Sequence, residues 1–165
     1  NAKKVIKMTK CDAIKIESNK KNYKIIEFLV RKNIPVMGHI GYTPQYKKKF
    51  KIEGQTNKEI KKLLNEAKMI EKAGAFSIVL ECLSPKSSKL ITNMLKIPTI
   101  GIGSSSYCDG QILVTDDMLG ISGFYPKFVK KYVNLNRLIE KAVKKYTREV
   151  KLNKFPTNKN FLNGT

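Results

Sequence analysis

The sequence of 165 residues predicts an α/β fold built on a parallel β-sheet. Short apolar runs alternate along the chain with longer segments whose apolar residues recur every three or four positions, as on one face of a helix. Charged or polar residues end three of the apolar runs, at 13–17, 36–41 and 77–82. Because helix-covered parallel strands are buried on both faces, charges at their carboxyl ends indicate a site for chemistry.

The first half of the chain predicts a strand, a helix and a second strand. Residues 1–10 are typical of the end of a helix, and the run 13–17 is the first strand. Helical spacing at 22–32 predicts the next helix, which ends before Pro35 because proline lacks the amide hydrogen that a helix interior needs. The second strand is expected at 36–40. Segment 41–56 has no helical period, and connections of this length are typical of binding loops.

The second half continues the alternation. Asn57 is the expected N-cap of a helix, and Ser84 followed by Pro85 predicts the start of another. The helices expected here run from Asn57 to residue 72, over 84–95 and around 135–151. The expected strands are 76–82, 99–102 and 112–114. Alternation predicts right-handed crossovers and a parallel sheet that is either open or part of a (β/α)₈ barrel. The nucleotide-binding motifs of open sheets are missing from the sequence.

The charge balance is strongly basic, with a net charge of +20. Of the 33 basic residues only Arg31, Arg137 and Arg148 are arginine, although base readout and phosphate clamping favour the guanidinium group. We therefore expect a solvated lysine-rich surface and no specific nucleic-acid partner. The alternative is a lysine-rich module that binds RNA or anionic surfaces.

The cysteines are Cys11, Cys82 and Cys108, which are odd in number and form no C-x-x-C pair. This pattern gives no support to a disulfide framework or a zinc ribbon and favours a reducing compartment. No uncharged apolar run is long enough to cross a bilayer. We expect a soluble protein without a membrane partner, cytoplasmic or else mitochondrial, whose true start precedes Asn1.

Lys15 and Glu17 share one face of the first strand, since residues two apart in a strand point the same way. Lys15 is a candidate amine nucleophile or counter-ion for a substrate carboxylate, and the alternative is a surface lysine. Glu17 is a candidate ligand for a hard cation such as Mg²⁺, and the alternative is a structural ion pair with Lys15.

Glu81 directly follows an apolar run, and a carboxylate in such surroundings is a competent general base near neutral pH. The alternative is a carboxylate that merely turns to water at a strand end. His39, the single histidine, either orients a ligand or caps a loop.

Five segments occur in an order that resembles the ketopantoate hydroxymethyltransferase family, also called 3-methyl-2-oxobutanoate hydroxymethyltransferase. They are 15–17 (KIE), 35–45 (PVMGHIGYTPQ), 74–82 (GAFSIVLEC), 97–103 (IPTIGIG) and 108–114 (CDGQILV). The resemblance covers nearly the whole chain. It implies a (β/α)₈ barrel of the phosphoenolpyruvate/pyruvate type. Residues 1–165 would then form about five βα units of its C-terminal part, a partial catalytic domain whose N-terminal strands are missing.

The resemblance also implies an activity. The family transfers a hydroxymethyl group from 5,10-methylenetetrahydrofolate to 3-methyl-2-oxobutanoate (α-ketoisovalerate), which gives ketopantoate for pantothenate biosynthesis. By position, Glu81 would be the proton acceptor, Lys15 and His39 would lie at the substrate, and Glu17 would bind Mg²⁺. In this family the earlier part of the barrel carries two metal-binding aspartates and a substrate-binding serine, and the full-length protein would be a homo-oligomer. A related Mg²⁺-dependent carbon–carbon lyase acting on a 2-keto acid is the alternative enzyme.

Overall fold

The computed structural model describes residues 1–18, 22–46 and 50–161. The chain divides into two compact units, Asn1–Ile112 and Leu113–Thr165. The first unit contains α1 (Ala2–Thr9), β1 (Ile14–Glu17), α2 (Tyr23–Arg31), β2 (Val36–Gly41), α3 (Asn57–Lys72), β3 (Ser77–Glu81), α4 (Pro85–Met94), β4 (Thr99–Ile102) and β5 (Gly110–Gln111). The second contains α5 (Thr115–Leu119), α6 (Leu135–Lys151) and a 3₁₀ turn at Asn158–Asn160.

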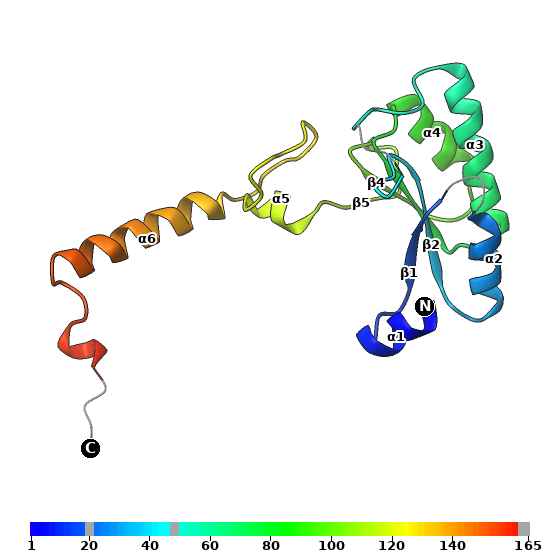
Figure 1. The fold of residues 1–165 in the computed structure, drawn as a ribbon. Coiled ribbons are helices and arrows are strands. Elements are labelled where there is room, and N and C mark those ends of the chain that lie inside the picture. The colour runs from blue at the N-terminus through cyan, green and yellow to red at the C-terminus, as the bar shows by residue number, and fades with distance from the viewer. Residues whose placement is uncertain (19–21, 47–49, 162–165) are drawn as a thin grey trace. The chain divides into compact units, whose positions relative to one another are not determined.

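The five strands form one parallel sheet in the order β1-β2-β3-β4-β5 (Figure 1). Spatial order therefore follows chain order. A doubly wound sheet would reverse its strand order at a switch point, whereas a (β/α)₈ barrel adds each strand beside the last. The sheet thus fits part of a barrel, which resolves the alternatives that the sequence left open and confirms the predicted fold class.

The helices α2, α3 and α4 lie on one side of the sheet (Figure 1) and bury its apolar residues. Val36, Ile40, Ile78 and Leu80 point to this side and belong to the core cluster. Gly38 lets α3 approach closely, because a Cβ there would lie 2.4 Å from Cγ2 of Ile70. Residues that alternate with these along the strands point to the other face of the sheet, among them His39, Glu81 and the apolar Val79.

The expected fifth strand at 112–114 is wrong. β5 is Gly110–Gln111, and Ile112 and Val114 are half exposed. The ladder ends here because β4 is short: the amide of Ile112 donates to the carbonyl of Gly101, and β4 ends one residue later. Gly110 and Gln111 have little intrinsic preference for a strand. The short strand β5 therefore forms because these residues pair with β4. The connection from β4 to β5 contains no helix, and α5 was not predicted.

The start of α3 also corrects the sequence prediction. Its N-cap is Thr56 and not Asn57. The Thr56 side chain accepts from the amide of Glu59, and the Glu59 carboxylate accepts from the amides of Gln55 and Thr56. For α4 the prediction is confirmed, since Ser84 is the N-cap and Pro85 the first helical residue.

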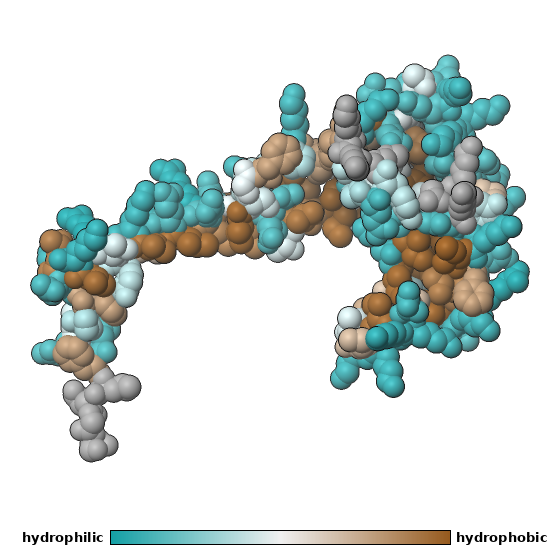
Figure 2. All heavy atoms as spheres, in the orientation of Figure 1, coloured by the Kyte–Doolittle hydropathy of each residue, from teal (hydrophilic) through white to brown (hydrophobic). Residues whose placement is uncertain are grey.

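In the second unit, α6 has apolar and basic residues on different faces (Figure 2). Its apolar face is exposed and comprises Leu138, Ile139, Val143, Tyr146 and Val150. The N-cap Asn134 accepts from the amide of Arg137, and basic residues occupy the last turn, where they complement the helix dipole.

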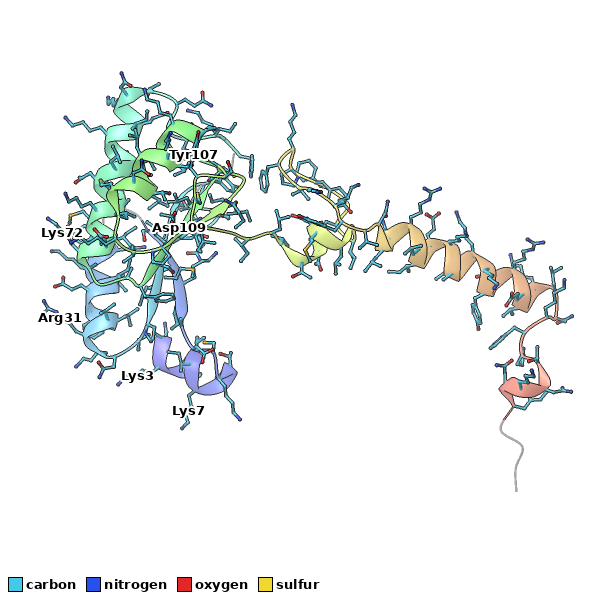
Figure 3. All side chains as sticks on the ribbon, turned by 180° about the vertical axis from the view of Figure 1, so that it is seen from behind. Lys3, Lys7, Arg31, Lys72, Tyr107 and Asp109 are labelled. Atoms are coloured by element: carbon cyan, nitrogen blue, oxygen red, sulfur yellow. The ribbon has the colours of Figure 1, made fainter. Side chains whose placement is uncertain are left out.

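Basic side chains of the first unit point outward from several helices. Lys3 and Lys7 on α1, Arg31 on α2 and Lys72 on α3 point away from the sheet (Figure 3). No helix in the described part of the chain is long and apolar enough to span a membrane.

Candidate active site

The four residues singled out from the sequence lie on one face of the sheet, opposite the helices. Between β1 and β2, Lys15 pairs with Met37 and Glu17 with His39. Between β2 and β3, Met37 pairs with Ser77, His39 with Val79 and Gly41 with Glu81. Side chains two apart along a strand share a face, so Lys15, Glu17, His39 and Glu81 all project to the side that becomes a barrel's interior.

His39 and Glu81 make the closest contact of the site. Nε2 of His39 lies 3.0 Å from Oε2 of Glu81, although the two groups lack the alignment of a hydrogen bond. The imidazole is fully buried, whereas the Glu81 side chain retains 15% exposure. The carboxylate therefore stands where buried protein meets solvent, at the end of β3.

Glu17 is buried and joins β1 to the loop after β2. Its Oε2 accepts a hydrogen bond from the amide of Gln45 at 3.0 Å. Nearby, the side-chain amide of Asn22 donates to the carbonyl of Glu17 and to the hydroxyl of Tyr46. These contacts hold the described start of the loop, up to Tyr46, beside the strand ends. Residues 47–49 of the predicted binding loop lie outside the described residues.

Lys15 stands apart from the other three residues. It lies on the same face, two residues before Glu17, and its side chain is exposed. An exposed ammonium group two residues from a buried carboxylate is available to an anion that enters from the open face.

Unusual backbone conformations hold the end of β3 in place. Gly41 has φ +96°, and a Cβ there would lie 2.1 Å from the carbonyl oxygen of Glu81. That carbonyl accepts from the amide of Tyr42, so the chain directly after β2 lies beside the end of β3. Cys82, the next residue, has φ 55°, a conformation that non-glycine residues rarely adopt. Strain of this kind is concentrated at functional sites.

The two buried thiols, of which Cys82 adjoins Glu81, are poor nucleophiles. All three cysteines are free, and Cys82 and Cys108 are buried. Burial, with the nearby carboxylates of Glu81 and Glu53, raises the pKa of Cys82 to about 12. Burial also raises the pKa of Cys108. Both groups stay protonated near neutral pH and pack as small apolar side chains.

Glu17 is the residue here that suits a hard cation. A buried carboxylate supplies the oxygen ligand that Mg²⁺ prefers. The described residues contain no group of three acidic, histidine or cysteine side chains that could hold a metal ion. Glu17 could therefore supply one carboxylate ligand, and the described residues do not complete a metal site around it.

Sequence reasoning missed two residues with structural roles: Ser104 orders the chain around Glu81, and Asp109 orders the start of β4, at the other end of the sheet. Ser104 donates to the carbonyl of Leu80 and accepts from the amide of Leu83, so it bridges the chain on both sides of Glu81. Asp109 accepts from the amide and the hydroxyl of Thr99. Ser104 lies in a run of small residues without any periodic signal. Asp109 was visible only as part of a quoted motif.

Comparison with known proteins agrees with this geometry. Residues 1–158 match the model of the family described as ketopantoate hydroxymethyltransferase. A 3-methyl-2-oxobutanoate hydroxymethyltransferase of Pelagibacter ubique is 50% identical over 159 residues, which cover 96% of this chain and 62% of that protein. Proteins of the same name from Clostridium botulinum and Francisella tularensis subsp. novicida are 49% and 51% identical, over 96% and 88% of this chain and 59% and 56% of theirs.

The chain thus spans about three fifths of the length of these curated relatives. The match runs through the sheet, the site and α6. A parallel sheet with its strands in chain order, and polar side chains gathered on the face opposite the helices, is what part of a barrel enzyme requires. The chain belongs to the ketopantoate hydroxymethyltransferase family.

Proposed function

We propose that this chain forms part of an enzyme that transfers a hydroxymethyl group from 5,10-methylenetetrahydrofolate to 3-methyl-2-oxobutanoate, giving ketopantoate for pantothenate biosynthesis. Family membership supports the reaction. The observation that carries the assignment to this site is the convergence of Glu17, His39 and Glu81 on one face, with His39 and Glu81 in contact.

In the proposed mechanism, Glu81 removes the proton from C3 of the keto acid. The C3–H bond breaks, its electrons form the enolate, and the Glu81 carboxylate takes up the proton. The enolate carbon forms a bond to the methylene carbon of the folate as one carbon–nitrogen bond of that methylene group breaks. Water then displaces the second folate nitrogen and supplies the hydroxyl group, and the proton held by Glu81 and the remaining proton of water pass to the two nitrogens of the leaving tetrahydrofolate. The position of Glu81 suits this role, because its side chain retains 15% exposure while a hydrogen bond from the amide of Tyr42 to its carbonyl holds its backbone.

Lys15 and Glu17 serve the same substrate in different ways. The Lys15 ammonium group offsets the negative charge of the substrate, so a Schiff base is unnecessary. Glu17 would hold Mg²⁺, which when bound polarises the keto group next to the reacting carbon. The remaining ligands would lie in the part of the barrel that this chain does not include.

Exchange of the C3 proton tests the function. We define the chimera as this chain joined to the part of the Pelagibacter ubique relative that lies outside the matched residues. With Mg²⁺ in D₂O and without folate, the chimera is expected to wash deuterium into 3-methyl-2-oxobutanoate, as NMR can follow. Glu81→Gln keeps the size of the side chain but cannot accept the proton, so exchange should fall by about 10² to 10⁴.

Two comparisons make this experiment decisive. Glu27→Gln, the same substitution on the exposed face of α2, should leave exchange unchanged. Binding of the keto acid, measured by calorimetry, should survive Glu81→Gln because Lys15 and Glu17 remain. Undiminished exchange in Glu81→Gln would remove Glu81 from the mechanism, and a folded chimera without exchange would count against the function itself.

A further inference from the structure

We propose that His39 is a positioning residue for Glu81: its Nε2–H fixes Oε2 of the carboxylate and leaves Oε1 to accept the substrate proton. The inference rests on the proposed function and deepens it. It assigns His39 a role through Glu81 instead of the direct substrate contact that the sequence suggested.

The placement of the two side chains supports this role. His39 is fully buried, and its Nε2 lies 3.0 Å from Oε2 of Glu81. Gly41, two residues after His39, pairs with Glu81 in the sheet, so the two side chains are diagonal neighbours on one face. Both come from strands, and groups on strands are held more rigidly than groups on loops.

The imidazole has no competing partner among the described residues. Neither Nδ1 nor Nε2 makes an aligned hydrogen bond there, and among the described residues the Glu81 carboxylate is the charged group within reach of Nε2. A buried N–H without an acceptor is costly, so the carboxylate is its natural partner. Catalytic hydrogen bonds are often poorly aligned before substrate binds and become aligned in the complex.

The contact with Glu81 determines which nitrogen of His39 carries the proton. A neutral imidazole carries one N–H, and the other nitrogen carries a lone pair. A lone pair on Nε2 would face the carboxylate at 3.0 Å and repel it, so the N–H belongs on Nε2. During the reaction the substrate proton moves to Oε1 of Glu81, and His39 keeps its own proton throughout.

The tautomer can be measured directly, because His39 is the single histidine of the chain. Long-range ¹H–¹⁵N NMR of the isolated chain should show a protonated Nε2. Glu81→Gln should shift the Nε2 resonance, while the control Glu27→Gln should not. An Nδ1–H tautomer, or an Nε2 chemical shift that is the same in wild type and Glu81→Gln, would overturn the proposal.

Kinetics in the chimera test the consequence for catalysis. Asn places its amide nitrogen near the position of Nδ1, whereas Gln reaches the position of Nε2. His39→Asn should therefore lower the rate constant of C3 exchange by about 10- to 100-fold, since misplacing a catalytic group has effects of this size. His39→Gln should recover most of that loss. The keto-acid concentration at half-maximal rate should stay the same in both variants.

These outcomes separate the positioning role from the other interpretations. A purely structural role for His39 predicts equal losses in both variants together with a lower unfolding midpoint. Direct substrate binding predicts a raised half-saturating concentration. Either result would overturn the proposal while leaving the exchange activity of the wild-type chimera, and hence the proposed function, intact. If wild-type exchange were missing but the NMR result held, the function would fail and the His39–Glu81 pair would stand.

Discussion

At the scale of single residues, Gly41 shows how backbone geometry supports the chemistry. Its φ of +96° suits glycine, and the carbonyl of Glu81 occupies the space that a side chain would need. Glycine therefore lets the end of β2 lie against the end of β3, where the proposed base sits. The sequence alone could not show whether glycine is required at position 41 by this close approach or by an ordinary turn.

Gly41→Ala is expected to destabilise the first unit by about 1–3 kcal/mol or more, because the residue would be strained and its Cβ would meet the Glu81 carbonyl. Urea unfolding followed by circular dichroism measures this. The matched control is Gly110→Ala, whose Cβ would meet only the terminal carbon of the Ile100 side chain at 2.9 Å. Equal midpoints for the two variants would contradict the argument.

Asp109 gives a second residue-scale prediction, on pH. Hydrogen bonds from the amide and hydroxyl of Thr99 lower the pKa of Asp109 (labelled in Figure 3). A carboxylate whose pKa is lowered by folding stabilises the fold above its unfolded pKa, and this contribution is lost as the pH falls through the folded pKa. Because Asp109 is exposed, we expect about 1 kcal/mol.

Asp109→Asn tests this, since asparagine keeps an acceptor oxygen but cannot ionise. The variant should unfold more easily than wild type in urea at pH 7, and the difference should vanish near pH 2, where the wild-type carboxyl is also neutral. A difference of the same size at both pH values would show that charge has no part in it.

At the scale of elements, the start of α3 depends on one capping residue. Thr56→Ala removes the side-chain oxygen that accepts from the Glu59 amide and should cost about 1 kcal/mol of unfolding free energy. Asn57→Ala is the matched control, because Asn57 is already helical and should be nearly neutral. Urea titration of both variants measures their free energies of unfolding. A larger loss of unfolding free energy in Asn57→Ala would show that Asn57 is the N-cap, as the sequence predicted.

At the scale of the whole molecule, the sheet has two edges. β1 and β5 each pair on one side only within the described residues. A closed barrel has no edges, whereas open strand edges offer unpaired backbone groups to other chains. The exposed apolar face of α6 is a further surface that favours association with other chains.

The isolated chain is therefore expected to self-associate and to be a poor enzyme. Size-exclusion chromatography with light scattering should show species larger than 18.8 kDa, and C3 exchange by the isolated chain should lie well below that of the chimera. We propose that the complete protein forms a homo-oligomer of defined size, for which the chimera should give a single narrow peak. A monomeric, fully active isolated chain would contradict this view of the domain.

Much of the fold followed from local patterns in the sequence. The strands around Ile16, Ile40 and Val79 and the long helix α3 were predicted because apolar periodicity and turn residues act over a few positions. The quoted motifs pointed to the family, which the comparisons show, and to Lys15, Glu17, His39 and Glu81, whose roles stay predictions.

Tertiary structure decided what depends on residues far apart in the chain. β5 exists because Gly110 and Gln111 pair with β4, and no local preference announces it. The contact between His39 and Glu81 joins residues 42 positions apart and follows from the register of β2 on β3. Alternation along a strand determines which side chains share a face, but only the pairing of strands determines which of them meet, because register is set by packing across the whole sheet.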